Sequence, residues 1–261
     1  MRVLEEKSGG LLHRFRDSKF LIGTAVIAIV SWEMVWLLSD GIGFYHSWVI
    51  AGFILEKSLS LEFWGSVFLT ISLTLLGLVV GSAIAIGIGY ALVNSPFLEN
   101  SARASLFFIR AIPSVAIIPL LLATIGSRLA LVVSLVIWMV VTKLIFFVMR
   151  AIQDQKSSFT EQARLLQLEP WQLFIYVRVP SALGMILTGV RLTVNRAYGA
   201  VVLAGLIAGT PGIGRDIHIA RLNADYEAVL GFAVIAALVG VLFFWFFKEI
   251  ESRTVRWRTV S

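Results

Sequence analysis

Four polar side chains with the chemistry to bind an anion recur at helical spacing in an apolar part of the sequence. They are three, four and three residues apart, which places them on one face of a helix; they are Thr188, Arg191, Asn195 and Tyr198. A guanidinium flanked by hydroxyl and amide groups offers positive charge and hydrogen-bond donors. We therefore treat these residues as candidates for lining a path that an anion can follow.

Arg191 has a second interpretation. It lies only eleven residues beyond Pro180, about 16 Å along a helix. Its side chain can therefore extend to the membrane interface or pair with a neighbour instead. Arg196 lies on another face of the same helix, and the partner we consider for it is Glu33, the one acid in the first apolar segment.

A similar polar stripe is formed by Ser134, Trp138 and Thr142. The tryptophan ring is suited to stacking on a planar substrate and equally to filling a helical core, so both interpretations stay open. Lys143 is one residue beyond this stripe. We expect it to lie near one membrane surface and to extend toward it.

Enzymatic and metal chemistry are not expected from this sequence. It contains no cysteine and three scattered histidines, His13, His46 and His218, which leaves little for a metal centre. The apolar segments hold no pair of acids and no nucleophile beside a base at a workable spacing. A Gly-Lys dipeptide is absent, so the phosphate-binding P-loop is absent as well.

The overall composition is that of a membrane protein. Hydrophobic residues make up 58% of the chain and charged residues 15%, and the mean hydropathy is +0.89. Soluble domains average about 45–50% apolar and about 25% charged residues. The net charge of +6 is explained by basic loops on one side of a membrane. It does not indicate nucleic-acid binding, because no basic stripe with interleaved aromatic residues is present.

Six apolar segments are long enough to cross a bilayer as helices, for which about 20 residues are needed. They are approximately residues 20–38, 64–93, 105–125, 129–149, 182–208 and 228–247. We therefore expect an all-α, polytopic membrane bundle of about six transmembrane helices in one domain. The expected divisions are a tail of residues 1–19, a transmembrane domain of residues 20–248 with an insert at 150–180, and a tail of residues 249–261.

The basic residues predict how the bundle is oriented. Fourteen Lys and Arg residues lie in the two tails and in the loops after the second and fourth segments, against four in the opposite loops. Basic residues concentrate in cytoplasmic loops. Both termini and the 150–180 insert are therefore predicted to be cytoplasmic.

Glycines are concentrated in the second segment and after the fifth. In the second segment they are Gly77, Gly81, Gly87 and Gly89. Such a small-residue surface lets helices approach closely, either within the chain or between two copies. Residues 209–214 read Gly-Thr-Pro-Gly-Ile-Gly, which predicts a turn on the external side.

Two prolines interrupt the third segment, Pro113 and Pro119. Proline lacks a backbone donor and disrupts a helix interior, so we expect a kink or break at these positions. Backbone carbonyls that lack a hydrogen-bond donor are tolerated inside a membrane where protein or a water-filled path covers them. Broken helices of this kind often line transport paths.

The 150–180 insert is polar and amphipathic. Ser158 and Glu161 have the spacing of a capping box, so a helix is expected to start near residue 159 and to end before Pro170. A second short helix is expected to begin at Pro170. Its apolar side carries Trp171, Phe174 and Val177. The mixed charge of the insert favours docking on a protein over lying on a lipid surface.

The same insert resembles the EAA motif of permease subunits of bacterial ABC importers. The residues that carry the resemblance are Glu161, Gln162, Ala163, Gln167, Val179 and Pro180. Segments outside the motif are similar to the branch that serves nitrate, bicarbonate, taurine and aliphatic sulfonates. These segments are residues 110–120, 171–174, 180–183, 186–191 and 212–214, and the resemblance extends from about residue 64 to the C-terminus.

The resemblance implies the fold and the partners of a type I ABC importer permease in the bacterial inner membrane. Such a permease pairs with a second copy or with a different permease, and it receives a small organic or inorganic anion from an extracytoplasmic solute-binding protein. ATP and Mg²⁺ are expected in two partner ATPase subunits, and no cofactor is expected in this chain. The residues implied to contact the ATPase are Ser158, Glu161, Ala163, Arg164, Leu166, Gln167, Pro170, Trp171 and Pro180.

The motif departs from the family pattern at two positions. Gln162 stands where the family has alanine, and Gln167 stands where it usually has glycine. Glycine permits close backbone approach, so the fit of this insert to an ATPase is expected to be modified. An ATP-independent channel or secondary carrier is the alternative, and it explains the apolar segments and the basic face but gives the insert no role.

Overall fold

The computed structural model describes residues 23–39, 43–93, 95–158, 169, 172 and 179–254. Every regular element within these ranges is a helix, as predicted. The helices are Gly23–Leu38, α2 (Ser47–Ser58), α3 (Leu61–Val93), α4 (Pro96–Ala111), α5 (Ser114–Thr124), α6 (Arg128–Ser158), α9 (Val179–Ala208), α10 (Ile213–Leu222) and α11 (Tyr226–Thr254).

Four helical segments are long and apolar enough to cross a membrane. They are Leu61–Val93, Arg128–Gln153, Ala182–Leu222 and Tyr226–Thr254. The pair α4 and α5 makes a fifth if it is taken as one bent span, and helix Gly23–Leu38 is a shorter apolar helix. The predicted segments therefore coincide with helices, while the number of spans and the orientation of the termini stay predictions.

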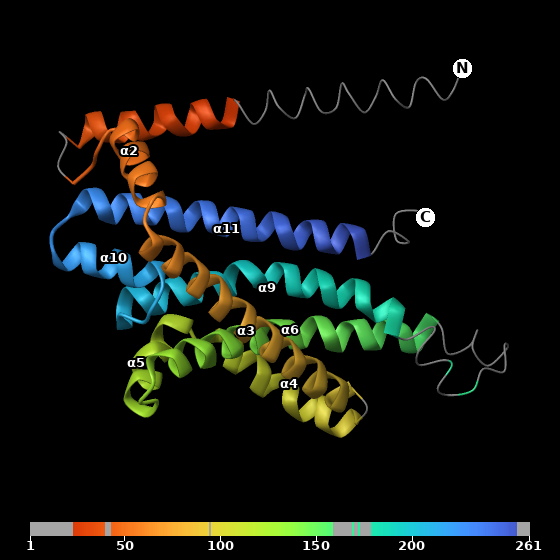
Figure 1. Cartoon of the computed structure of the whole chain (residues 1–261). Coiled ribbons are helices and arrows are strands. Elements are labelled where there is room, and N and C mark those ends of the chain that lie inside the picture. The colour runs from red at the N-terminus through yellow and green to blue at the C-terminus, as the bar shows by residue number, and fades with distance from the viewer. Residues whose placement is uncertain are drawn as a thin grey trace, which may run out of the picture.

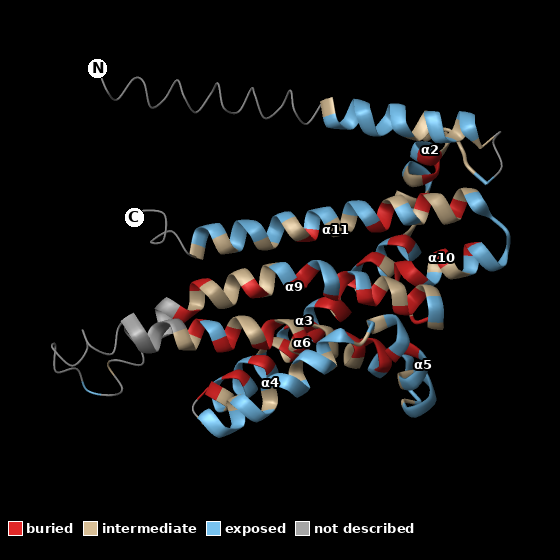
Figure 2. Ribbon diagram, turned by 180° about the vertical axis from the view of Figure 1, so that it is seen from behind, coloured by how far each residue is buried: buried red, intermediate tan, exposed pale blue. Residues whose placement is uncertain are grey.

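The core of the bundle is built by α3, α6 and α9, where these helices meet and carry many of the buried residues drawn in red in Figure 2. Helix α6 packs against both α3 and α9, and α11 covers another side of α9 together with α10. Figure 1 shows that α6 ends, α9 begins and α11 ends at the same end of the bundle, at the right of the view. We call this the insert end, because residues 159–178 connect α6 to α9 there. Helix α10 lies at the opposite end.

Glycines of α3 allow its close approach to α6. A Cβ atom added at Gly77, Gly81 or Gly89 would lie 2.4 to 2.8 Å from side-chain atoms of Val136, Val140 and Val148, respectively. These distances are too short for a real contact, so only glycine fits there. The small-residue surface therefore packs within the chain. Gly87 is off this contact, with open space around it.

The third predicted segment is broken at Pro113. Helix α4 ends at Ala111, Ile112 and Pro113 are extended, and α5 begins at Ser114 with its axis turned by 90°. The break predicted at Pro113 is confirmed. The break predicted at Pro119 is wrong, because this residue lies inside α5. Pro119 is the sixth of the eleven residues of α5; its missing donor leaves the carbonyl four residues earlier without that hydrogen bond, while the helix continues on both sides.

The turn between α9 and α10 depends on two glycines with positive φ. Gly209 has φ of +61° and Gly212 has φ of +125°, a region that side-chain-bearing residues rarely adopt. The amide of Ile213 then donates to Oγ1 of Thr70 on α3 at 3.0 Å. The predicted turn is confirmed, whereas the short helices α2 and α10 that follow the loops were not expected.

Two helices extend past their predicted ends. Helix α6 continues from the predicted end at residue 149 to Ser158, and α11 continues to Thr254, past the boundary at 248. Ser158 was expected to cap a new helix, but it is the last residue described in α6. The extra turns are polar, as expected for helix ends that project beyond an apolar layer.

Candidate functional site

Most of the predicted coupling residues lie outside the described part of the chain. They are Glu161, Ala163, Arg164, Leu166, Gln167, Pro170 and Trp171. Ser158 is at the end of α6, and Pro180 is in the first turn of α9. The two helices that flank the insert are therefore defined, and both belong to the core of the bundle.

Two described residues within the insert fit a helix start at Pro170. Gln172 is helical and Glu169 is not, and the amide of Glu169 donates to Oε1 of Gln172 at 3.0 Å. A side chain three positions into a helix that accepts from the capping amide is half of a capping box. This contact supports the predicted second helix.

Thr188 and Arg191, from the predicted anion-binding stripe, contact α11. Nε of Arg191 lies 2.8 Å from Oε2 of Glu251. The hydroxyl of Thr188 donates to the other oxygen of this carboxylate at 2.6 Å. The structure therefore agrees with the second interpretation of Arg191, in which it pairs with a neighbour.

Tyr198 is also directed toward α11. Its side chain is 6% exposed, and its hydroxyl donates to the carbonyl of Ala236 at 2.7 Å. Gly240 leaves room for the ring, because a Cβ atom there would lie 3.1 Å from Cε1 of Tyr198. The tyrosine joins α9 to α11 and is not open to solvent.

Asn195 is more exposed than the other three residues of the predicted stripe, Thr188, Arg191 and Tyr198. It is exposed, and so are three other residues of α9 at helical spacing; together they are Leu192, Asn195, Arg196 and Gly199. We call these four residues the open face of α9. Gly199 has no atom within 4 Å of an added Cβ, so no described residue packs closely on this face at that level.

The stripe on α6 is partly buried. Ser134 and Trp138 are intermediate in exposure, and Thr142 is buried with its hydroxyl donating to the carbonyl of Trp138 at 2.8 Å. Trp138 packs against the core formed by α3, α6 and α9. This contact agrees with the core-filling interpretation of the tryptophan.

The pair considered for Arg196 and Glu33 is not formed. Oε2 of Glu33 lies 2.8 Å from Nδ1 of His46, and Oε1 accepts from the amide of Ser47 at 2.9 Å. The His46 ring lies between two indole rings, those of Trp36 and Trp48, with centroid distances of 3.7 Å on both sides. Glu33 therefore fixes helix Gly23–Leu38 to the start of α2, leaving Arg196 without this partner.

Lys143 is near the middle of α6, because the helix continues to Ser158, and it lies ten residues before the end of the apolar segment at Gln153. Its expected extension to a membrane surface stays a prediction. The positive charges of Arg196 on α9 and of Arg110 in the last turn of α4 both act on Lys143. The guanidinium of Arg110 lies 5.2 Å from the ring centroid of Phe146, one turn from Lys143. Arg110 was not among the predicted site residues. The signal that could have found it is basic side chains within apolar segments.

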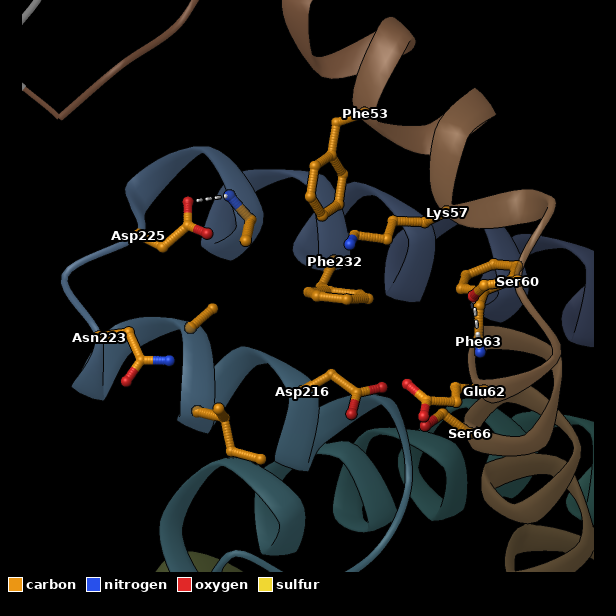
Figure 3. Close-up of a pocket in the computed structure, with 13 residues that line it drawn as sticks. Phe53, Lys57, Ser60, Glu62, Phe63, Ser66, Asp216, Asn223, Asp225 and Phe232 are labelled. Atoms are coloured by element: carbon orange, nitrogen blue, oxygen red, sulfur yellow. Dashed lines mark hydrogen bonds between the residues drawn. The ribbon is translucent and has the colours of Figure 1, made fainter.

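A cavity of about 340 Å³ lies at the end opposite the insert. Figure 3 shows Asp216 of α10 and Glu62 of α3 pointing toward each other, beside Ser66. Phenylalanine rings line the other walls, and Nζ of Lys57 lies 5.5 Å from the centroid of Phe53. Within the described ranges, no group of three or more His, Asp or Glu side chains is arranged to hold a metal ion.

The architecture and the sequence match one family of transport proteins. The family described as binding-protein-dependent transport system inner membrane component matches residues 81–256, more than half of the chain. The chain belongs to this family. Its members are permease subunits of transporters and not catalytic subunits, and the multiple apolar helices agree with an inner-membrane, multi-pass protein.

Curated relatives of this permease include proteins with named substrates. It is 28% identical over 203 residues to the putative aliphatic sulfonates transport permease protein of Bacillus subtilis, covering 78% of this chain and 74% of that protein. It is 24% identical over 204 residues to the nitrate import permease protein of a Synechocystis strain, covering 77% and 71%. A probable ABC transporter permease protein of Brucella abortus is 24% identical over 209 residues, covering 78% and 84%.

Solved structures agree with the fold of this permease. A chain of the methionine ABC transporter MetNI, in an inward-facing conformation, superposes with a TM-score of 0.63 at 18% sequence identity. The match covers 74% of this chain and 96% of that chain. The predicted type I ABC importer permease fold is therefore confirmed.

Proposed function

We propose that this permease forms, with a second permease, the substrate path of an ATP-driven importer in the bacterial inner membrane. The substrate is a small organic or inorganic anion. Family membership supports the transport role. Two relatives named for sulfonate and nitrate transport support the substrate class.

The observation that carries the coupling proposal is the position of the insert between two core helices. Residues 159–178 join α6 to α9, and these two helices bury most of the shared core. A rigid element gripped by a closing ATPase dimer rotates the helices attached at its ends. ATP and Mg²⁺ bind to the ATPase subunits, and alternating access follows from the tilt of α6 and α9.

Substrate enters from the opposite end in this mechanism. A solute-binding protein delivers it near the turn formed by Gly209 and Gly212, where α9, α10 and α3 meet. The predicted path residues Ser134, Trp138 and Asn195 are on α6 and α9, the helices that the insert moves. Thr188, Arg191 and Tyr198 support the path by fixing α9 to α11.

The test is to separate ATP hydrolysis from uptake in the complete complex in proteoliposomes. Glu161→Lys, or Gln167→Trp beside Leu166, should leave ATP hydrolysis present and reduce ATP-dependent uptake about tenfold or more. A charge reversal or added bulk at the ATPase contact disturbs the transfer of movement from the ATPase to the permease helices, but it does not alter the ATP-hydrolysing site itself. Glu56→Lys, the same charge change on an exposed residue of α2, is the control and should leave both activities unchanged.

Two outcomes would contradict the proposal. Full ATP-dependent uptake by both insert variants would remove the insert from the coupling mechanism. Flux that continues without ATP, together with copurification of no ATPase, would favour a channel or secondary carrier.

A further inference from the structure

The start of helix α10 is capped by a side chain of a different helix. The first amides of an α-helix have no acceptor within the helix, and a side chain at the N-cap position usually accepts from one of them. The N-cap residue of α10 is Gly212, which has no side chain. The amide of Ile213 donates instead to Oγ1 of Thr70 on α3, at 3.0 Å. Thr70 and Ile213 are both 0% exposed, so water does not replace this contact.

Thr70 is oriented for this contact by its own helix. Its hydroxyl donates to the carbonyl of Ser66 at 2.8 Å. A hydroxyl group has one donor and two acceptor positions, so the same oxygen can accept from Ile213. The fit is close, because a Cβ atom added at Gly212 would lie 2.5 Å from this oxygen. The two hydrogen bonds together fix the direction of the Thr70 hydroxyl.

Helix α10 also lies with its backbone against α9. A Cβ atom added at Gly205 of α9 would lie 2.7 Å from Cα of Gly214 on α10, so no side chain separates the two helices there. One turn further along α10, Nδ1 of His218 donates to the carbonyl of Leu206 at 2.8 Å. Contacts between backbones leave no side-chain rotation that could absorb a shift. Helix α10 is therefore attached to α9 at two levels beyond the connecting turn.

The side chain of Ile213 attaches α10 to the core. It is in a cluster with Phe63 and Val67 of α3 and with Ile235 and Ala236 of α11. Close-packed interiors have low compressibility and transmit strain. The turn before α10 contains two glycines with positive φ, and small residues of this kind can serve as a hinge. The helix that follows this turn is nevertheless held by α3, α9 and α11.

We propose that Thr70 positions α10 so that α10 moves with α9 as one rigid unit during transport. This inference rests on the proposed coupling mechanism, in which the insert moves α9. Helix α9 has 30 residues and is about 45 Å long, which separates the insert from the turn before α10. Movement that begins at the insert then reaches α10, at the end where the proposed mechanism places the solute-binding protein. A lid hinged at the glycine turn would move separately from α9.

Hydrogen–deuterium exchange of the complete complex in nanodiscs tests this unit. Exchange of the amides of residues 209–222 is measured with ADP and with MgATP plus vanadate. In the wild type it should be equally slow in both states, because a rigid unit does not open when it moves. In Thr70→Val the buried amide of Ile213 loses its acceptor, which costs about 1–3 kcal/mol, so exchange at the start of α10 should be about fivefold or more faster.

The nucleotide dependence separates a role in movement from a purely structural contact. In Thr70→Val the acceleration should be larger with MgATP and vanadate than with ADP, because α10 is loaded only when α9 moves. Thr70→Ser keeps the hydroxyl and should restore wild-type exchange to within about twofold. The matched control is Thr193→Val, because Thr193 of α9 is 1% exposed and its hydroxyl donates within its own helix, to the carbonyl of Gly189 at 2.7 Å. This control should leave exchange of α10 unchanged.

Several results would overturn the proposal. Faster exchange of wild-type residues 209–222 in one nucleotide state would make α10 a separate lid. Slow exchange in Thr70→Val, equal acceleration in both nucleotide states, no rescue by Thr70→Ser, or the same acceleration by Thr193→Val would each remove the positioning role of Thr70. Glu161→Lys tests the insert at the other end of α9 by uptake and ATP hydrolysis, so failure of this inference is distinguished from failure of the importer mechanism.

Discussion

The two arginines in the middle of α9 have opposite environments although they are five residues apart. Arg191 faces α11 and lies 2.8 Å from a carboxylate oxygen of Glu251. Arg196 is exposed on the open face of α9, without an acidic partner among the described residues. Five residues turn a helix by about 140°. The arginine on one side of α9 therefore packs against a neighbouring helix, whereas the arginine on the other side is exposed. The difference indicates which intramembrane charge is structural and which is available to a ligand.

The largest difference between the two sides of α9 is expected for alanine substitutions of its glycines. Gly205 faces α10, where an added Cβ would lie 2.7 Å from Cα of Gly214 and 2.8 Å from the amide nitrogen of Arg215. These are backbone atoms and cannot rotate away, so Gly205→Ala should destabilise the permease by about 3 kcal/mol, the upper part of the range for overpacking. The measurement is thermal unfolding of the complex in detergent.

Gly199→Ala is the matched control on the open face. It has no atom within 4 Å of the added Cβ, and alanine favours a helix over glycine by about 1 kcal/mol. The variant should therefore unfold at the same or a higher temperature. Equal destabilisation by both substitutions would show that the open face is covered as closely as the face toward α10.

The second comparison exchanges the two arginines for glutamine. Arg191→Gln leaves Glu251 with only the Thr188 hydroxyl, and an unsatisfied buried acceptor costs about 1–3 kcal/mol. Arg196 is exposed and has no acidic partner among the described residues, so for Arg196→Gln the stability should stay equal or rise. Unfolding temperatures measured on both variants test this, and a lower temperature for Arg196→Gln than for Arg191→Gln would reverse the assignment.

The smallest effect is expected at Tyr198. Tyr198→Phe removes the hydrogen bond to the Ala236 carbonyl but keeps the ring against Gly240, which should cost about 1 kcal/mol. Uptake in proteoliposomes should stay within twofold of wild type, because this hydroxyl faces α11. A strong loss of uptake with unchanged stability would return Tyr198 to the substrate path.

The sequence predicted the long helices well, because a bilayer requires continuous apolar runs. It predicted α3, α6, α9 and α11 to within a few residues at their apolar ends. The polar last turns of α6 were predicted to be part of a loop, because their composition does not distinguish a helix that projects beyond the membrane from a loop. The depth of Lys143 in a membrane is counted from the end of the apolar segment at Gln153 and not from the helix end, so its expected position near a membrane surface stays a prediction.

The candidate site was predicted less well. Spacing grouped Thr188, Arg191, Asn195 and Tyr198 on one side of a helix, yet the structure divides them between the contact with α11 and the open face. The four side chains lie within about 80° around the helix axis, so angle alone does not separate the exposed Asn195 from the residues that contact α11. Sequence spacing gives the angles around a helix and does not show which neighbour lies at each level along it.

The sequence by itself determined the membrane class, the family resemblance, the break at Pro113 and the glycine turn before α10. Each of these follows from local chemistry: apolar length, motif residues, a missing backbone donor and a positive φ. Only the tertiary structure decided that Arg191 pairs with Glu251 and that Glu33 pairs with His46. A charge in an apolar medium is stabilised by whatever lies within a few ångströms, and those neighbours belong to other elements of the fold.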